Sequence, residues 1–425
     1  SQEALFILDP TKRAGRTGKR RVVRVAAGET PILAVAAPNP SRPGINQIIV
    51  ADPGGESIHL LRNKTGIIET IDIGIPMENI DVRGDGRFGV VYLPEGKRPT
   101  SSLVAFPNAI SIVDLAEGAA SPRTMRLPDS AARPIRAEFA DSLKLATAEG
   151  AEKSAALALV FVEDGVVAVD LNSGRAGNLI ALTSERGLNI RPTEVHFTNN
   201  RGDDIRGAVD SVERAFVQTT EGELFVLAIR GSISSQAELD IHLTLENVIT
   251  PQEAVYDADL FFDEEGKSLL LAAAGNEIIL VDGYTGVSTS IDPGMWIDEV
   301  ITYVEGKSNK ERVLAYSKFS LQSRALRLNP LELQSGRSTG LEILYFANDI
   351  LSIETGPNRD LALIRYRDKA ELGFLTLAEG ESVLDLRLSA GVSALRLDAK
   401  KKRVWLVGES SYDEKPRLAE VSLGG

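Results

Sequence analysis

Glutamate recurs at one position of a repeated phrase in this sequence. The residues are Glu78, Glu194 and Glu253, each two residues after a proline, with Asp298 and Glu299 near the same place in a later copy. Carboxylates gathered from separate strands can hold a hard cation such as Ca²⁺, or attract a basic segment of another protein. Glu78, Glu194, Glu253 and Glu299 are therefore candidates for one shared site. The alternative is that each glutamate only solvates a strand start or pairs with an arginine.

Other catalytic signatures are missing from the sequence. His59, His196 and His242 lie in separate apolar segments without a short metal-ligand spacing, so a zinc site would require all three to converge in the fold. The chain has no cysteine, which excludes disulfides, thiolate metal sites and thiol nucleophiles. Nucleophile-elbow, Walker and dinucleotide-binding motifs are absent as well. We expect no catalytic residue and no cofactor other than a possible Ca²⁺.

One basic segment stands out in an acidic chain. Between residues 12 and 24 there is no acidic residue, and the bases are Lys12, Arg13, Arg16, Lys19, Arg20, Arg21 and Arg24. Such a segment can contact anionic lipid headgroups or an acidic partner surface. The alternative is a solvated hairpin loop that joins the strands FILD and RRVVRVA.

These residues must be positioned by a repeated unit of short strands. Repeats of about fifty residues are typical of solenoids and propellers, and here they start at Pro31, Pro76, Pro134, Pro192, Pro251, Trp296, Ile350 and Val392. Each repeat has room for four strands. The third strand is the most regular, as in ISIVDLAEG (110–118), VVAVDLNSG (166–174) and IILVDGYTG (278–286), and it ends in a glycine turn.

The pattern predicts an all-β fold, a β-propeller of about eight four-stranded blades in a single domain over residues 1–425. Seven blades remain possible if the weak repeat at 350–391 is incomplete. The last repeat supplies only three strands, near 394–398, 403–408 and 417–423. Residues 4–26 resemble the last part of a repeat that lacks its first strands. We therefore expect the strands at the two chain ends to form one blade together, which would cover two otherwise exposed sheet edges.

The phrase INQIIVADPGGESIHLLRNKTGIIETIDIG, followed by PMENIDVRGDGR, resembles the YVTN and NHL class of β-propeller repeats. The turns Asp170–Gly174 and Asp282–Gly286 also resemble those of quinoprotein-type eight-bladed propellers. The chain departs from WD40 repeats, which carry a Trp-Asp dipeptide, and from kelch repeats, which carry a Gly-Gly pair. It also lacks the docking tryptophan of quinoprotein dehydrogenases, which puts a bound quinone in doubt.

Composition narrows the possible partners. The net charge of −13 disfavours nucleic acid, and no apolar stretch approaches the roughly 18 residues of a membrane helix. An aromatic content of 5% argues against stacking surfaces for sugars or bases. The segments 94–108, 119–133, 142–155 and 199–213 read as long loops, which favour recognition of other molecules.

These observations favour a non-enzymatic interaction or scaffold module, a subunit of a bacterial cell-envelope assembly whose partners are other proteins. The alternative is a propeller enzyme or ligand binder, such as a metal-assisted lactonase or lyase with its site at the central channel mouth. We expect a periplasmic or extracellular protein, with a lipid anchor before processing or trimming as an open alternative, because cysteine is absent and Ser1-Gln2-Glu3 has no initiator methionine.

Overall fold

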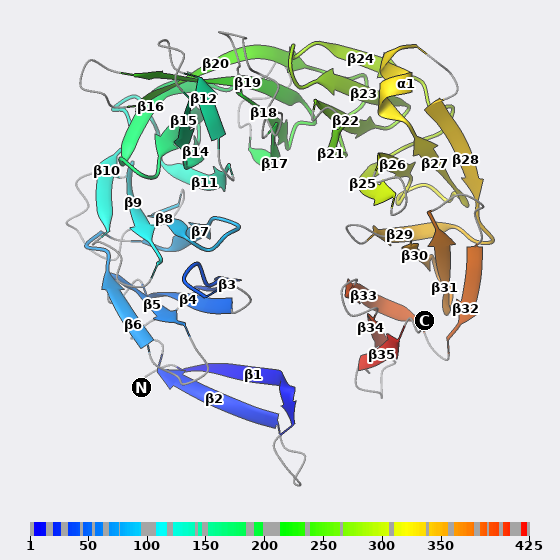
Figure 1. Cartoon of the computed structure of the whole chain (residues 1–425), viewed down its shortest axis with the longest axis horizontal. Helices are drawn as coiled ribbons and strands as arrows, with labels where there is room; N and C mark the ends of the chain where they lie inside the picture. The colour runs from blue at the N-terminus through cyan, green and yellow to red at the C-terminus, as the bar shows by residue number, and fades with distance from the viewer. Residues whose placement is uncertain are drawn as a thin grey trace. The chain divides into compact units, whose positions relative to one another are not determined.

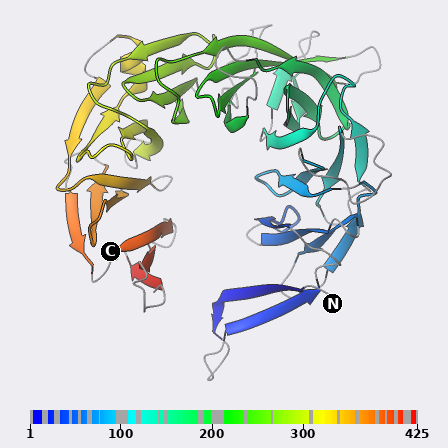
Figure 2. The same ribbon diagram turned by 180° about the vertical axis from the view of Figure 1, so that it is seen from behind.

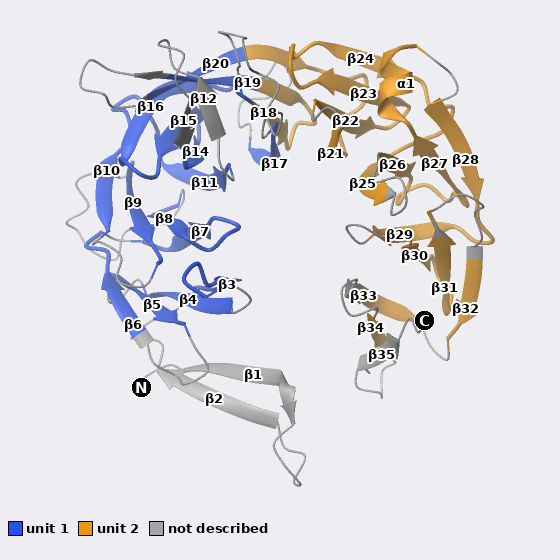
Figure 3. Ribbon diagram, viewed as in Figure 1, with its two compact units in different colours: residues 1–199, 207–213, 227–245 blue, residues 200–206, 214–226, 246–425 orange. Residues whose placement is uncertain are grey.

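The computed structural model describes residues 4–13, 20–26, 33–42, 46–52, 56–62, 68–75, 77–94, 108–116, 122–140, 143–146, 152–183, 191–198, 213–233, 239–263, 267–305, 310–336, 340–355, 361–377, 383–388, 391–398, 403–408 and 418–422. They belong to two compact units (Figure 3). Unit 1 comprises residues 1–199, 207–213 and 227–245, and unit 2 comprises residues 200–206, 214–226 and 246–425. The expected single domain over residues 1–425 stays a prediction.

In the described part of unit 1, four-stranded antiparallel sheets follow one another along the chain (Figure 1). They are β3 (Leu33–Pro38), β4 (Asn46–Asp52), β5 (Ser57–Leu61) and β6 (Ile68–Asp72); β7 (Asn79–Val82), β8 (Phe88–Tyr92), β9 (Ala109–Asp114) and β10 (Arg123–Arg126); and β11 (Pro134–Phe139), β14 (Leu157–Val162), β15 (Gly165–Asp170) and β16 (Arg175–Ala181). Two hairpins accompany them: β1 (Ala4–Arg13) with β2 (Arg20–Ala26), and β12 (Leu143–Ala146) with β13 (Glu152–Ala155).

Unit 2 repeats the same arrangement, as the view from behind also shows (Figure 2). Its sheets are β21 (Asp257–Phe262), β22 (Ser268–Ala274), β23 (Glu277–Asp282) and β24 (Ser288–Ile291); β25 (Glu299–Glu305), β26 (Lys310–Tyr316), β27 (Arg324–Leu328) and β28 (Leu341–Tyr345); β29 (Ile350–Thr355), β30 (Leu361–Tyr366), β31 (Glu371–Thr376) and β32 (Val383–Arg387); and β33 (Val392–Asp398), β34 (Arg403–Gly408) and β35 (Leu418–Ser422). A short helix, α1 (Pro330–Gln334), follows β27. One further sheet has residues in both units: β17 (Pro192–Phe197), β18 (Glu213–Thr219), β19 (Leu224–Ile233) and β20 (Leu239–Ile249).

Sequence-adjacent meanders of four antiparallel strands are the blades of a β-propeller, and the predicted fold class is confirmed. The first strands begin as predicted at Pro134, Pro192, Ile350 and Val392, and a few residues late in the other repeats. The weak repeat at 350–391 is a complete four-stranded blade. Apart from the two hairpins, the described strands thus form seven four-stranded sheets and one of three strands, which agrees with eight repeats.

Two of the expected long loops contain strands instead. Residues 123–126 form β10, and within the segment 142–155 the residues 143–146 and 152–155 form β12 and β13. The sequence signal was weak because these strands have only four residues each. The other two segments, 94–108 and 199–213, lie largely outside the described residues.

At the chain ends, the described strands form a hairpin and a three-stranded sheet. β2 pairs with β1, with Ala4 opposite Ala26 and Leu8 opposite Val22, and the described pairings give the last sheet only β33, β34 and β35. Completion of one blade by both ends therefore stays a prediction. Of the basic segment, Lys12, Arg13, Arg20, Arg21 and Arg24 belong to this hairpin, whereas Arg16 and Lys19 lie outside the described residues.

Neighbouring blades are held together by their apolar faces. Between the first two blades, Ile49 and Leu60 pack in one buried cluster with Val91 and Val113. The same pattern joins the other neighbouring blades within each unit. Full burial of one such side chain is worth about 1.5–3 kcal/mol. Both faces of a middle blade are covered, which explains why its strands read as continuous apolar runs rather than as an alternating pattern.

The predicted turns after the third strands are formed by an aspartate. In the turn at Asp170, Oδ1 accepts the N–H of Asn172 at 2.9 Å and Oδ2 accepts the hydroxyl of Ser173 at 2.7 Å. Gly174 N–H bonds to the carbonyl of Asp170 and has a φ of +71°, the left-handed conformation that favours glycine. Burial alone would raise the pKa of Asp282 in the equivalent turn, but hydrogen bonds from Thr285, Gln334 and Tyr284 outweigh it and lower that pKa.

Each of these turns is also bonded by an arginine of the preceding blade. Arg62 donates to the carbonyls of Leu115 and Ala116, Arg123 to those of Leu171 and Asn172, and Arg214 to that of Gly283. Arg62 and Arg214 are buried and also pair with glutamates, Glu69 and Glu246. The regular VDL and VDG ends of the third strands therefore join one blade to the next.

Replacing Arg214 by alanine is expected to lower the free energy of unfolding by about 3 kcal/mol, because a buried guanidinium loses three hydrogen bonds to Glu246 and Gly283. The matched control is Arg387→Ala, which removes an exposed pair with Glu371 and should cost about 1 kcal/mol or less. Urea denaturation of both variants measures the difference. Equal losses would contradict the role assigned to Arg214.

Candidate functional site

The predicted glutamates lie at or next to the first strands of their blades. Glu78 directly precedes β7, Glu194 lies in β17, Glu253 lies in the segment before β21, and Glu299 begins β25. Glu78 and Glu194 belong to unit 1, and Glu253 and Glu299 belong to unit 2. Their convergence on one site therefore stays a prediction. Within the described residues, no three acidic, histidine or cysteine side chains form a group able to hold a metal ion.

In unit 1, Glu138 interacts electrostatically with both Glu194 and Asp81, although the glutamate pattern reveals neither Glu138 nor Asp81. Glu138 in β11 and Asp81 in β7 are partly buried, and burial raises the pKa of each carboxyl. The negative charges of Asp81 and Glu194 raise that of Glu138 further, against the lowering effect of Arg136. Arg136 pairs with Glu138 and donates to the carbonyl of Thr193 at 2.7 Å, so it bridges two first strands.

Asp81 has a structural partner in each neighbouring strand. Its Oδ2 lies 2.7 Å from the Tyr92 hydroxyl and accepts the N–H of Ala137, in the next blade, at 2.7 Å. The same kind of hydrogen bond from one first strand to the next occurs in unit 2, where Asp257 and Asp259 accept backbone N–H groups of β25 at 2.9 and 2.8 Å. These aspartates hold first strands together, which accounts for their burial without a catalytic role.

The histidines have separate surroundings. His59 Nδ1 lies 3.0 Å from the Thr70 hydroxyl and its Nε2 lies 3.5 Å from Asp52. His196 lies 3.7 Å from Glu194, and His242 is exposed on β20.

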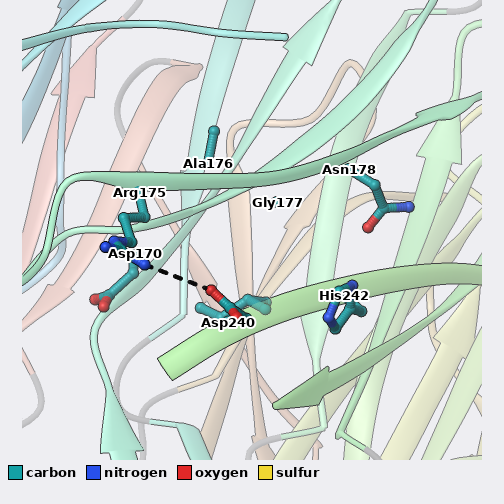
Figure 4. A pocket seen from close by; sticks show the side chains of 8 residues that line it. Asp170, Arg175, Ala176, Gly177, Asn178, Asp240 and His242 are labelled. Atoms are coloured by element: carbon teal, nitrogen blue, oxygen red, sulfur yellow. Dashed lines mark ion pairs between the residues drawn. The ribbon is translucent and has the colours of Figure 1, made fainter. Parts of the chain in front are cut away.

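His242 lines a hollow of about 180 Å³ in unit 1, between β16 and β20 (Figure 4). Its charged members are Asp170, Arg175 and Asp240, and Arg175 lies 3.8 Å from Asp240. The Asn178 side chain bonds to both the N–H and the carbonyl of Leu243, at 3.0 and 3.1 Å. The hollow thus lies beside a contact between two outer strands, in which Asn178, Arg175 and Asp240 take part.

A different feature of unit 2 has the character of a binding surface. Four large apolar side chains, Tyr256, Trp296, Phe319 and Leu321, lie on connections at the ends of the sheets where β21 and β25 begin. We call them the aromatic face. Tyr256 contacts Trp296 and Phe319, with ring centroids 5.7 and 6.4 Å apart. Phe319 is 69% exposed and Leu321 is 72% exposed. Phe319 also lies against Tyr256, so these exposed apolar side chains are not scattered singly.

Hydrogen bonds to Asp298 hold the turn that carries Phe319. This buried carboxylate accepts the Ser317 hydroxyl at 2.8 Å and the N–H groups of Lys318 and Phe319 at 2.5 and 3.0 Å. Arg367, from the next blade, donates to the carbonyl of Lys318. Phe319 is therefore presented on a fixed turn, although its ring is open to solvent.

Trp296 is fixed by the preceding blade. Gly275 and Ile297 exchange backbone hydrogen bonds of 3.0 and 2.8 Å across the blade boundary. A Cβ on Gly275 would lie 3.0 Å from the Trp296 ring and 3.1 Å from Glu253 Cγ. Only glycine therefore leaves room for both side chains to pack against this position. The predicted glutamate Glu253 thus lies beside the aromatic face, and Glu299 joins it through Lys318, whose Nζ is 2.9 Å away.

Sequence reasoning missed this face because its members are spread over residues 256–321 and the aromatic content of the chain is low. A usable signal was present in the segment SKFSLQS (317–323). Its two large apolar residues alternate with polar ones between two predicted strands, where a turn would normally be polar.

Comparison with known proteins gives only distant structural likenesses. No family model matches the chain, and no curated protein does either. Similar solved structures include the dihydro-heme d1 dehydrogenase NirN in complex with DHE, at 11% identity over 92% of this chain and 75% of that chain, with a TM-score of 0.44. Others are BBS1N in complex with ARL6DN, at 14% identity over 91% and 98% with a TM-score of 0.37, and a mitotic checkpoint complex, at 11% identity over 99% of both with a TM-score of 0.37. Likeness of this degree assigns no activity, ligand or partner to this chain.

The β-propeller assignment rests on the sheets themselves, and the likeness to the YVTN and NHL class stays a prediction. No helix among the described residues is long and apolar enough to cross a membrane.

The raised pKa of Glu138 predicts a pH-dependent effect of its removal. Above this pKa the carboxylate is charged in both the folded and the unfolded chain, so only the folded state bears the cost of its burial. Glu138→Gln is therefore expected to raise the melting temperature at about pH 8, and the gain should shrink as the pH falls and the wild-type carboxyl takes up its proton.

Calorimetry of the wild-type protein and the Glu138→Gln variant, at about pH 8 and at several lower pH values, measures the two melting temperatures. Glu342→Gln, at an exposed pair with Arg327, is the control and should change stability little. A gain that is the same at every pH would show that burial of the Glu138 charge is not its cause.

Proposed function

We propose that this chain is a non-enzymatic β-propeller module that binds a partner protein through the aromatic face. The observation that carries the proposal is a pair of exposed apolar side chains, Phe319 and Leu321, on a turn held by buried hydrogen bonds. Aromatic and aliphatic anchors of this kind supply most of the energy of protein interfaces. Because the turn is already ordered, binding loses little conformational entropy.

A catalytic role has less support. The described residues contain no group of three potential metal ligands, and the charged groups of the hollow at β16 and β20 are engaged with one another or in turns. A metal-assisted lactonase or lyase is therefore the weaker proposal. The absence of cysteine supports the further proposal of an exported protein in a bacterial envelope assembly.

The double variant Phe319→Ala, Leu321→Ala is expected to lose a partner that the wild-type protein retains at physiological salt, because the apolar anchors are removed from the turn. Its melting temperature should change little, since both side chains are exposed. Chemical cross-linking and affinity capture from the native source, followed by mass spectrometry, identify the proteins retained.

The matched control is Tyr284→Ala, which removes a ring that is 60% exposed in the turn between β23 and β24, at the opposite end of its blade from Tyr256. It should retain the same partner as wild type. Loss of the partner in the control, or retention in the double variant, would rule out the aromatic face as the binding surface.

A further inference from the structure

The aromatic face already holds one positive charge from its own chain. Lys318 Nζ lies 5.9 Å from the centre of the Phe319 ring and 2.9 Å from Glu299 Oε1. A cation between an aromatic ring and a carboxylate gains attraction from the ring quadrupole and from the opposite charge. In the part of the aromatic face formed by β25 and the turn after β26, the ring and the carboxylate therefore already interact with a cation of the same chain.

The other half has the same two components. Trp296 provides the ring, and Glu253 provides the carboxylate, because both side chains lie within about 3 Å of the Cβ position of Gly275. Tryptophan is the strongest of the aromatic residues in cation binding. Glu253 is exposed, and it has no ion pair among the described residues.

We propose that Trp296 and Glu253 bind an arginine or lysine side chain of the partner protein, next to an apolar residue of the same segment that packs on Phe319 and Leu321. The inference rests on the proposed function of the aromatic face and names its ligand class: an extended segment that is both basic and apolar. Arginine is the better fit, since its planar guanidinium stacks on a ring and bonds to a carboxylate at once.

The charges around the face favour such a segment. Connections before a first strand and between second and third strands lie at the same end of an antiparallel blade. Among the described residues of unit 2, the exposed acidic residues on these connections are Glu221, Glu253, Asp292 and Asp368. The bases there are the exposed Lys369 and Lys318, whose side chain is 45% exposed and pairs with Glu299. Together with a net charge of −13, this excess attracts a basic partner and repels an acidic one.

Two labelled peptides test the charge requirement. Both carry the same leucines, but the cationic positions hold arginine in one peptide and citrulline, its neutral isostere, in the other. Fluorescence anisotropy should show the arginine peptide binding wild type on the order of tenfold more tightly than the citrulline peptide. Glu253→Gln and Trp296→Leu should each reduce this preference to about twofold.

The control is Asp129→Asn, which removes the same charge from an exposed site of unit 1 and should leave the preference unchanged. Equal affinity of the two peptides for wild type overturns the cation site. If Phe319→Ala, Leu321→Ala still weakens both peptides in that case, the aromatic face survives as a protein-binding surface and only its charge preference is wrong. An equal loss of preference in Asp129→Asn would mean that net charge alone attracts the peptide.

Discussion

The contact between one blade and the next is the interaction on which the rest of this structure depends. A single four-stranded sheet of this chain is apolar on both faces and cannot bury either of them alone. Packing against neighbours removes those faces from water, as with Ile49 and Val91 between the first two blades. Buried arginines such as Arg214 add directional bonds to the next blade. Apolar packing thus supplies most of the energy, and the arginines fix how each blade is aligned with its neighbour.

The same boundary contacts also shape the aromatic face. Trp296 is placed by the bridge between Gly275 and Ile297, and Phe319 by hydrogen bonds to Asp298 and by Arg367 of the following blade. Three consecutive blades therefore contribute to one exposed surface. Because these contacts are part of the blade packing, the surface is rigid without any bound partner, which is the condition under which exposed anchors bind efficiently.

Acidic residues illustrate how environment decides the role of a side chain. Asp81 accepts hydrogen bonds from its own blade and from the next, and Asp298 accepts them from the turn of its own blade that carries Phe319, so both aspartates have structural roles. Burial also raises the pKa of Glu138, which faces the charges of Asp81 and Glu194. Glu253, of the same chemical type, is exposed beside a tryptophan ring.

The sequence by itself determined the repeated unit of four strands, the first strands at Pro134, Pro192, Ile350 and Val392, and the aspartate turns, because strand period and turn chemistry are local properties of the chain. It also marked Glu253 and Glu299 as residues to examine. Only the tertiary structure decided that Glu253 lies against Trp296, that Lys318 joins Glu299 to Phe319, and that Arg214 reaches Gly283. Those contacts join separate strands, and in most cases separate blades, and their partners are chosen by the packing of apolar faces rather than by spacing along the chain.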